Sequence, residues 1–188
     1  MIKKEIRILG IDDSPFKKSN DKKVLIVGTI FRGGEFMDGL ISTYVDMDGN
    51  DSTERIVEMV NRTKHRPQLR VIMLKGISVA GFNVIDINLL SKKTKLPVMV
   101  VMKERPNLEK ITKALEKIPD GKSKMSLIKK AGKITRIGHL FTQSAGISGN
   151  ELTEIIKISC THGKIPEPIR VAHIIASGIV IGESRGRA

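Results

Sequence analysis

Apolar positions in the first quarter of the chain fall in short segments that are typical of β-strands. Residues 5–11 (EIRILGI) alternate in character and contain β-branched side chains, which is typical of a strand. Residues 23–31 (KVLIVGTIF) and 35–46 (EFMDGLISTYVD) are likewise predicted to be strands. The three residues 32–34 (RGG) join them, and so short a connection predicts a hairpin. The pattern therefore predicts three antiparallel strands in sequential order.

The spacing of apolar residues changes after residue 50. Residues 51–64 (DSTERIVEMVNRTK) carry one apolar stripe at helical spacing, which predicts a helix. Residues 69–74 (LRVIML) form a short continuous apolar run, as in a central strand that is buried on both faces. A helix is then predicted at 84–92 and a strand at 97–102. Since helices join these later strands, we expect a mixed α/β sheet.

The second half of the chain is predicted to be mainly helical. The expected elements are helices at 107–117, 122–131, 148–160 and 166–177 and a short strand around 137–142. Residues 182–188 (GESRGRA) are expected to form a flexible or partner-bound tail. Neither an internal repeat nor a long linker divides the sequence. We therefore expect one domain over residues 1–188, with helices flanking the sheet and a helical C-terminal part.

Composition indicates an aliphatic core and a basic surface. Apolar residues make up 40% of the 188 positions, but aromatic residues only 3%, and tryptophan is absent. The core is therefore expected to consist of Ile, Val, Leu and Met. The formal charge is +13, from 33 Lys and Arg against 20 Asp and Glu. This excess favours binding to nucleic acid first and to an anionic membrane second, although a well-solvated surface explains it equally well.

Several kinds of site and location are disfavoured. Cys160 is the single cysteine, which leaves no intrachain disulfide and no cysteine-based zinc site and is typical of a reducing cytosol. Residues 1–10 lack a signal-peptide pattern, and no apolar stretch is long enough to span a membrane. The glycines match neither the Walker nor the Rossmann pattern. We expect a cytoplasmic protein without a membrane segment or a nucleotide cofactor, and the oligomeric state stays open.

Two adjacent carboxylates, Asp12 and Asp13, follow the first predicted strand directly. Burying two negative charges side by side is unfavourable unless something compensates for them. A turn, a cation and a metal ion are the three alternatives, and the residues alone do not decide among them.

Longer features of the chain resemble known nucleases. Three sequential strands followed by alternating helices and strands, with a carboxylate on the first strand, resemble the ribonuclease H-like arrangement. Residues 163–179 (GKIPEPIRVAHIIASGI) are similar to the closing helix of endonuclease V. Residues 74–87 (LKGISVAGFNVIDI) and 175–188 (IASGIVIGESRGRA) resemble an archaeal family labelled endonuclease dU, which is itself similar to endonuclease V.

The resemblance implies a fold, an activity and a cofactor. The implied fold is a ribonuclease H-like mixed sheet. The implied activity is that of a nuclease dependent on Mg²⁺ (or Mn²⁺) that cuts near deaminated bases, here of the deoxyuridine type, in DNA repair. The implied partner is nucleic acid, with DNA favoured over RNA.

The resemblance also implies carboxylate metal ligands. The segment GID at 10–12 matches the Gly-hydrophobic-Asp motif of endonuclease V, which makes Asp12 the first ligand; a turn-forming Asp is the alternative. Asp51 matches the second acid, before the first helix, and a plain N-cap is its alternative. Asp86 is the candidate third ligand, or else a capping or exposed residue. Carboxylate oxygens suit Mg²⁺, and Asp13 is then a supporting or turn residue.

Two positions depart from the endonuclease V pattern. Where endonuclease V has Val-Asp-Gly after its fourth strand, this chain reads LKG, with Lys75 in the place of the acid. A protonated lysine cannot bind a metal ion. The Gly-His-x-Ile-Ser stretch of endonuclease V corresponds to residues 144–148 (SAGIS), which lack a histidine, and His139 lies upstream. His173 lies in the apolar run VAHIIA and is interpreted as a core or surface histidine.

Candidate substrate contacts lie near the ends of predicted strands. Lys103 follows the fifth strand, where a lysine of endonuclease V faces the phosphate, and a solvated lysine is the alternative. Asn83 is expected to hydrogen-bond a phosphate or a base edge. Phe16 and Phe82 are expected to wall a small pocket for an extruded base. The residues predicted to contact substrate are Phe16, Lys75, Gly81, Phe82 and Asn83.

Functions of different classes stay open. In the first, Asp12, Asp51 and Asp86 hold a metal ion whose water attacks the phosphodiester, and Lys103 stabilises the developing charge. In the second, the chain is a non-catalytic nucleic-acid-binding protein that retains the fold, because Lys75 supplies the positive charge that a cation would bring. A third and weaker idea is a structural partner in a larger nucleic-acid complex, held through residues 182–188.

Overall fold

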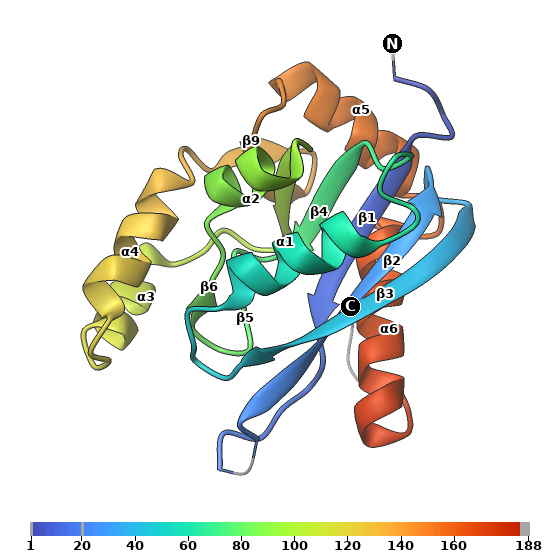
Figure 1. Cartoon of the computed structure of the whole chain (residues 1–188). Helices are drawn as coiled ribbons and strands as arrows, with labels where there is room; N and C mark the ends of the chain where they lie inside the picture. Colours follow the sequence, from blue (N-terminus) through green and yellow to red (C-terminus); the bar gives the residue numbers. More distant parts are fainter. Residues whose placement is uncertain (1, 20, 185–188) are drawn as a thin grey trace.

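The computed structural model describes residues 2–19 and 21–184 and has a mixed seven-stranded sheet at its centre (Figure 1). The strands of this sheet are β1 (Arg7–Asp13), β2 (Lys23–Arg32), β3 (Phe36–Asp46), β4 (Val71–Lys75), β7 (Val98–Met102), β8 (Thr135–Ile137) and β9 (Leu140–Ala145). They lie side by side in the order β3-β2-β1-β4-β7-β9-β8. A separate two-stranded ribbon consists of β5 (Ser78–Val79) and β6 (Asn83–Val84).

The directions of the strands decide where functional side chains gather. β1, β2 and β3 pair antiparallel, which confirms the predicted N-terminal strands. β4 pairs parallel with both β1 and β7, whereas β9 returns antiparallel beside β7 and carries β8 at the edge. The sheet is therefore mixed, as predicted, and the carboxyl ends of β1, β4 and β7 meet at one edge.

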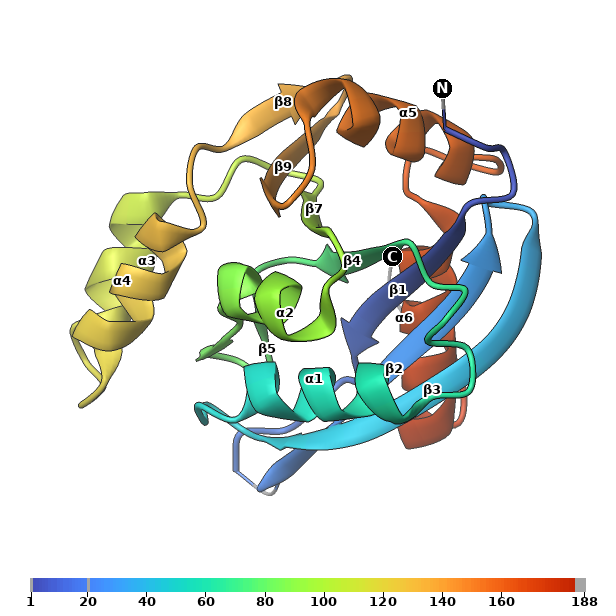
Figure 2. The ribbon, with the colours of Figure 1, turned by 45° about the horizontal axis from the view of Figure 1, so that its top comes forward.

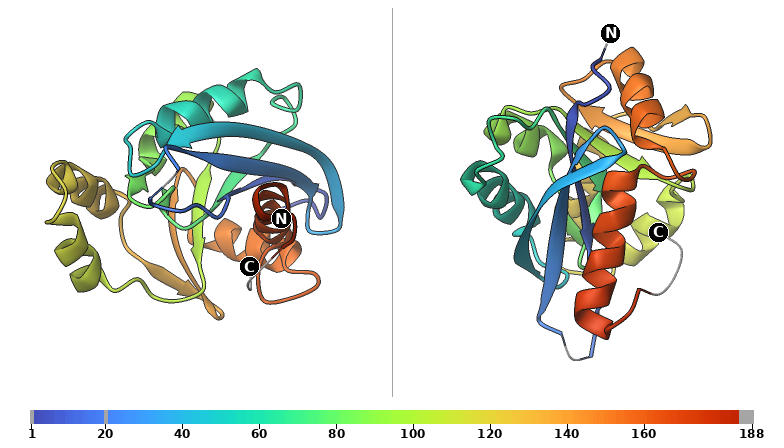
Figure 3. Two further views of the ribbon diagram at one scale, coloured as in Figure 1. Left: turned by 90° about the horizontal axis from the view of Figure 1, so that it is seen from below. Right: turned by 90° about the vertical axis from the view of Figure 1, so that its right-hand side faces the viewer.

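Helices cover both faces of the sheet. The helices are α1 (Ser52–Arg62), α2 (Ile87–Thr94), α3 (Leu108–Leu115), α4 (Gly121–Lys130), α5 (Gly149–Ser159) and α6 (Glu167–Ile181). Leu9 and Ile11 of β1 share a core with α1 and α2, whereas Ile8 packs on the other face with α5 and α6. Figures 2 and 3 show α1 and α6 on opposite sides of β1 and β2. No helix in the described residues is both long and apolar enough to cross a membrane.

α3 and α4 form an appendage, which we call the α3–α4 hairpin. It lies to one side of the sheet, as Figure 2 shows. The hairpin has its own small apolar cluster, in which Leu115 and Ile128 pack with Val84 of β6. The apolar contacts of the appendage with the rest of the domain are therefore made with the β5–β6 ribbon and the residues beside it.

Two predicted elements differ from the structure. The predicted helix 84–92 begins only at Ile87, because residues 83–84 pair with residues 78–79 in the ribbon. The predicted strand 137–142 is instead the hairpin of β8 and β9. In both places, strands as short as two or three residues pair within a segment that the sequence pattern predicted to be a single element.

The last helix is longer than the sequence predicted. α6 continues to Ile181, beyond the predicted end at residue 177. Gly182 ends the helix with a left-handed φ of 78°, which a glycine adopts without strain. The tail prediction for 182–188 falls largely on residues 185–188, which lie outside the described residues.

Candidate functional site at the carboxyl ends of the parallel strands

Three ionisable side chains lie at the edge where the parallel strands end. Asp12 is close to the end of β1, Lys75 is the last residue of β4, and Lys103 follows β7 directly. The strands are paired in register up to this edge. Open α/β sheets bind ligands at the carboxyl ends of their parallel strands. These three side chains are therefore the first candidates for a functional site.

Asp12, Lys75 and His173 contact one another, and we call them the Asp12 cluster. The Nζ of Lys75 and the Nδ1 of His173 each lie 2.9 Å from Oδ2 of Asp12, and the two nitrogens are 3.0 Å apart. The Asp12 side chain is 4% exposed and the Lys75 side chain 27%. The carboxylate is thus buried while the ammonium reaches solvent, and the ammonium compensates for the buried negative charge.

The two ring nitrogens of His173 differ in their hydrogen-bond partners. Its Nδ1 either donates to Asp12 or accepts from Lys75, and the tautomer decides which. Its Nε2 is buried and has no hydrogen-bond partner within the described part of the chain. Buried polar atoms almost always have a partner, so a lone one at such an edge is typical of a site completed by water or ligand.

Gly10 allows α6 to bring His173 to Asp12. A Cβ atom on Gly10 would lie 2.3 Å from the backbone carbonyl carbon of Pro168, so only glycine permits this approach. Thr29 Oγ1 also donates a 2.6 Å hydrogen bond to the Pro168 carbonyl. The sequence interpretation of His173 as a core or surface histidine therefore missed a contact with the cluster. The sequence signal for this contact between His173 and Asp12 is Gly10, because a glycine on a buried strand permits a helix to pack closely against that strand.

Asp13 connects the end of β1 to the loop between β5 and β6. Its Oδ2 accepts a 2.7 Å hydrogen bond from the backbone N–H of Ala80. Burial, and then the negative charge of Asp12, raise the pKa of Asp13 to about 6, although the Ala80 N–H acts in the opposite direction. Asp13 is thus a partly buried neighbour of the cluster, in keeping with the supporting role predicted for it.

A hollow of about 250 Å³ opens beside the cluster. Lys75 and Lys103 line it, and we call it the Lys75–Lys103 hollow. Its apolar walls include Val101, Leu140, Ile165 and Ile169. Two cationic side chains in a mainly apolar hollow suit an anion such as a phosphate, because low polarity strengthens charge attraction.

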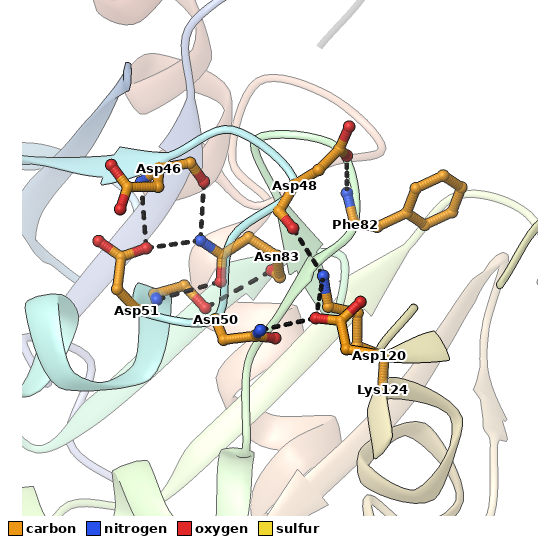
Figure 4. A network of polar contacts seen from close by, with 9 residues as sticks. Asp46, Asp48, Asn50, Asp51, Phe82, Asn83, Asp120 and Lys124 are labelled. Carbon is orange, nitrogen blue, oxygen red and sulfur yellow. Dashed lines mark hydrogen bonds and ion pairs between the residues drawn. The ribbon is translucent and has the colours of Figure 1, made fainter. Parts of the chain in front are cut away.

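A second network holds Asp51 and Asn83 (Figure 4). Asn83 Nδ2 donates to Asp51 Oδ1 at 2.7 Å and to the Asp46 carbonyl at 2.9 Å. Asn83 Oδ1 accepts from the Ser52 N–H at 3.1 Å. Asn83 is fully buried, so its amide is used inside the protein. The predicted contact of Asn83 with a phosphate or base edge is therefore not supported.

Asp51 hydrogen-bonds the backbone of β3 and the side chain of Asn83. It occupies the N-cap position of α1 but makes no side-chain capping hydrogen bond. Its Oδ1 accepts from the Asp46 N–H at 3.0 Å and from Asn83. Its Oδ2 lies 3.6 Å from the guanidinium Nε of Arg55. Asp51 therefore stabilises the turn between β3 and α1.

The same network joins this turn to α4. The Lys124 side chain is 1% exposed, and its Nζ lies 2.7 Å from the Asp48 carbonyl oxygen and 3.1 Å from Asp120 Oδ2. Asn50 Nδ2 donates to Asp120 Oδ2 at 2.6 Å, which lowers the pKa of Asp120. A buried ammonium group thus fastens the α3–α4 hairpin to the β3–α1 turn, as Figure 4 shows.

Gly81, Phe82 and Phe16 have structural contacts. A Cβ atom on Gly81, whose φ is +85°, would lie 2.2 Å from Asp48 Oδ1, the oxygen that accepts the Phe82 N–H at 2.7 Å. The Phe82 ring packs with the cluster of the α3–α4 hairpin, and the Nζ of Lys18 lies 5.1 Å from its centroid. Phe16 packs instead against the core beneath α1 and α2. The predicted pocket walled by both rings is therefore not supported.

Asp86 is the N-cap of α2, which was the alternative to a metal ligand. Its Oδ1 accepts the N–H groups of Asn88 and Leu89 at 3.0 and 2.9 Å, and its Oδ2 lies 2.7 Å from the Lys130 Nζ. Burial alone would raise the pKa of Asp86, but Lys130 and the Leu89 N–H lower it below its usual value. The carboxylate is therefore engaged on both oxygens.

Comparison with known proteins decides the family. The family model described as Endonuclease dU matches residues 4–180. The chain belongs to the Endonuclease dU family. A UPF0215 protein of Methanothermobacter thermautotrophicus is 52% identical over 191 residues, covering 100% of this chain and 94% of the relative. The crystal structure of a protein of unknown function from Archaeoglobus fulgidus is similar with a TM-score of 0.88 and 38% identity, covering 94% of this chain and 99% of that one.

Endonuclease V shares the fold of this Endonuclease dU family protein. The Ciona intestinalis enzyme, solved with a DNA that contains an inosine followed by a ribo-adenosine, has a TM-score of 0.56 at 17% identity. The similar region covers 88% of this chain and 82% of that one. At this identity the likeness shows the fold alone, and it confirms the expected ribonuclease H-like sheet.

The Mg²⁺ ligand set expected from the sequence is not assembled in this Endonuclease dU family protein. Asp12, Asp51 and Asp86 belong to three separate sets of contacts. Residues 2–19 and 21–184 contain no group of three His, Cys, Asp or Glu side chains that could hold a metal ion. Asp12 is paired instead with the ammonium of Lys75, which has no lone pair to offer a metal. The residues present therefore do not fit Mg²⁺ or Mn²⁺ at Asp12.

Proposed function

We propose that this protein is an endonuclease that cuts DNA next to a deaminated base of the deoxyuridine type and serves DNA repair. Membership of the Endonuclease dU family supports the reaction class. The observation that carries the site is that Lys75 and Lys103 line one hollow beside the buried carboxylate of Asp12. The DNA bound by the similar Ciona endonuclease V favours DNA as the partner.

The Lys75–Lys103 hollow suits the phosphodiester. Each ammonium group can donate hydrogen bonds to a non-bridging phosphate oxygen, and ionised donors make the stronger hydrogen bonds. The apolar walls, Leu140 and Ile169 among them, reduce the water around these charges. Charge that develops on the phosphoryl oxygens would therefore meet preorganised cations.

Hydrolysis at this place needs two proton transfers. The water oxygen forms a bond to phosphorus while the bond from phosphorus to the leaving sugar oxygen breaks. The attacking water gives up a proton, and Asp12 or His173 can accept it, being the acceptors of the Asp12 cluster. The leaving oxygen takes up a proton, which the ammonium of Lys75 can supply. The cluster therefore holds both kinds of proton-transfer group within hydrogen-bond distance of each other.

The α3–α4 hairpin supplies a surface for the nucleic-acid backbone. It follows β7 and therefore leaves the sheet at the same edge as Lys103. The exposed lysines on and just after the hairpin are Lys110, Lys113, Lys117, Lys122, Lys129, Lys130 and Lys133. Such side chains contact phosphates without reading sequence, so this surface contributes affinity that falls with salt.

A second candidate function is a nucleic-acid-binding protein without catalysis. The contact between Lys75 and Asp12 favours it, because this ion pair neutralises the carboxylate that a metal-dependent nuclease would use. Under this proposal the Lys75–Lys103 hollow still binds phosphate, but no bond is broken.

The deciding experiment is cleavage of end-labelled oligonucleotides. Single- and double-stranded DNA with one deoxyuridine or deoxyinosine, and the RNA counterparts, are incubated in Mg²⁺, Mn²⁺ or EDTA. The proposal expects cleavage beside the deaminated base by the wild type, its loss in Asp12→Asn, and its retention in the surface control Glu58→Gln. Salt-sensitive binding without cleavage in any condition would favour the non-catalytic candidate. Equal cleavage by wild type and Asp12→Asn would refute the assigned site.

A further inference from the structure

The residue at the end of β4 is a cation in a place where the fold family is expected to hold a metal ion. The ammonium of Lys75 lies 2.9 Å from Asp12 Oδ2 and 3.0 Å from His173 Nδ1. We infer that Lys75 is the built-in cation of this site. It holds the Asp12 carboxylate and binds a phosphate oxygen of nucleic acid, so that phosphate binding needs no divalent metal. This inference rests on the proposed function only in taking nucleic acid as the ligand.

The hydrogen-bonding capacity of Lys75 fits this role. An ammonium group donates up to three hydrogen bonds. Two of its contacts in the described structure are to Asp12 and His173. The side chain is 27% exposed and lines the hollow that Lys103 also lines. A third N–H is therefore available toward the hollow, where a phosphate oxygen can accept it.

The cationic groups at this site disfavour a second cation. Lys75 and Lys103 both line the hollow, and the Lys75 ammonium already lies 2.9 Å from the Asp12 carboxylate. A divalent cation at Asp12 would stand beside that ammonium and be repelled by it. The hollow is therefore better suited to an anion than to a divalent cation.

The substitution Lys75→Asp should reverse this arrangement. It removes the ammonium and places a carboxylate across from Asp12, with the imidazole of His173 beside them. Carboxylates and imidazole are donors that Mn²⁺ accepts. Lys75→Met removes the charge and adds no ligand, Lys75→Arg keeps the charge, and Lys3→Met is a matched control at the other end of β1, where Lys3 is exposed.

The test measures metal and nucleic acid separately. Mn²⁺ binding is followed by electron paramagnetic resonance, and oligonucleotide binding by fluorescence anisotropy in Mg²⁺ or EDTA at matched ionic strength. We expect wild type to bind DNA with an affinity within about twofold in the two buffers, and Lys75→Met to bind about tenfold more weakly. Lys3→Met should bind like wild type, and Lys75→Arg, which keeps the positive charge, should lose less affinity than Lys75→Met. Lys75→Asp should bind one Mn²⁺ and need it for DNA binding.

Two outcomes would overturn the inference. One is a single Mn²⁺ bound by wild type and lost in Asp12→Asn. The other is unchanged DNA affinity in Lys75→Met, with circular dichroism confirming that the variant is folded. A wild type that cuts DNA only with Mn²⁺ bound at Asp12 would refute the inference and leave the proposed function intact. A wild type that binds DNA equally in EDTA and Mg²⁺ but never cuts would support the inference and refute the nuclease.

Discussion

Oδ2 of Asp13 accepts a 2.7 Å hydrogen bond from the backbone N–H of Ala80. This contact holds the end of β1 against the loop between β5 and β6, and it partly buries a carboxyl group that lies beside Asp12. Burial first, and then the charge of Asp12, raise the pKa of Asp13 from 3.8 to about 6. Between about pH 4 and pH 6, Asp13 is therefore still largely protonated in the folded protein, whereas it has largely lost its proton in the unfolded chain.

Asp13→Asn is expected to stabilise the protein at neutral pH. Because the pKa of Asp13 is higher in the folded state, the wild type loses stability as pH rises from about 4 to about 6, and the full loss of at most about 3 kcal/mol applies above that range. The variant keeps an acceptor for Ala80 and has no charge to bury. Urea unfolding at pH 4 and pH 7 measures the difference between the two proteins.

Asp38→Asn is a control for the pH experiment, because the pKa of Asp38 is shifted in the opposite direction to that of Asp13. The hydrogen bonds from Arg32 lower the pKa of Asp38, so its contribution is present at neutral pH and is lost as pH falls through the acidic range. Asp38→Asn should therefore be less stable than wild type at pH 7. A gap between Asp13→Asn and wild type that does not change between pH 4 and 7 would contradict the first prediction.

Gly10→Ala should separate α6 from the sheet. The added methyl group would meet the backbone of Pro168 at 2.3 Å, and such overpacking costs about 1–3 kcal/mol. Since α6 carries His173, cleavage and DNA binding should weaken as well. Gly178→Ala is the matched control on the same helix, because nothing lies within 4 Å of its added Cβ atom. Chemical denaturation of both variants checks this, and equal midpoints would count against the close approach at Gly10.

Lys124→Met should destabilise the attachment of the α3–α4 hairpin. The substitution keeps the apolar stem but leaves the partly buried Asp48 carbonyl without its 2.7 Å ammonium donor, and the loss of such a partner costs at most about 3 kcal/mol. Lys122→Met is the control, since Lys122 is exposed on the same helix. Thermal unfolding should separate the two variants. A Lys122→Met variant that is destabilised as much as Lys124→Met would argue against the special role of Lys124.

The lysines of the α3–α4 hairpin should set the salt dependence of DNA binding. Replacing Lys113, Lys117 and Lys129 with alanine is expected to reduce the slope of log affinity against log salt, by about 0.9 for each phosphate of duplex DNA that the variant no longer neutralises. The control replaces three exposed lysines away from this hairpin, Lys3, Lys4 and Lys157. Anisotropy titrations over a salt series measure both slopes, and equal slopes would exclude the hairpin from the interface.

The sequence predicted the sheet better than it predicted the site. Alternation over residues 5–11 and the apolar run over residues 23–31 are local signals, and they correctly indicated the first strands. The β5–β6 ribbon has two-residue strands, which are too short for any periodicity to show. Asp12 and His173 are 161 residues apart in the chain, and their contact depends on how Gly10 packs against α6.

Asn83 and Asp86 show why residue type alone misled the site prediction. Both are polar residues close to a glycine-containing turn, and substrate contacts are common near such turns. Their side chains are nevertheless used to satisfy backbone groups of α1 and α2. Whether an amide or a carboxylate serves the fold or a ligand depends on three-dimensional neighbours that local sequence does not specify.

The small separate core of the α3–α4 hairpin has a consequence for hydrogen exchange. Its apolar cluster meets the rest of the domain at Val84 of β6, and polar contacts of Lys124, Lys130 and Gln143 complete the attachment. The hairpin can therefore open as a cooperative unit while β1, β4 and β7 stay paired. Amide protons of residues 108–130 should exchange with deuterium by this local opening, earlier than those of β1, and DNA bound along the hairpin should slow them selectively.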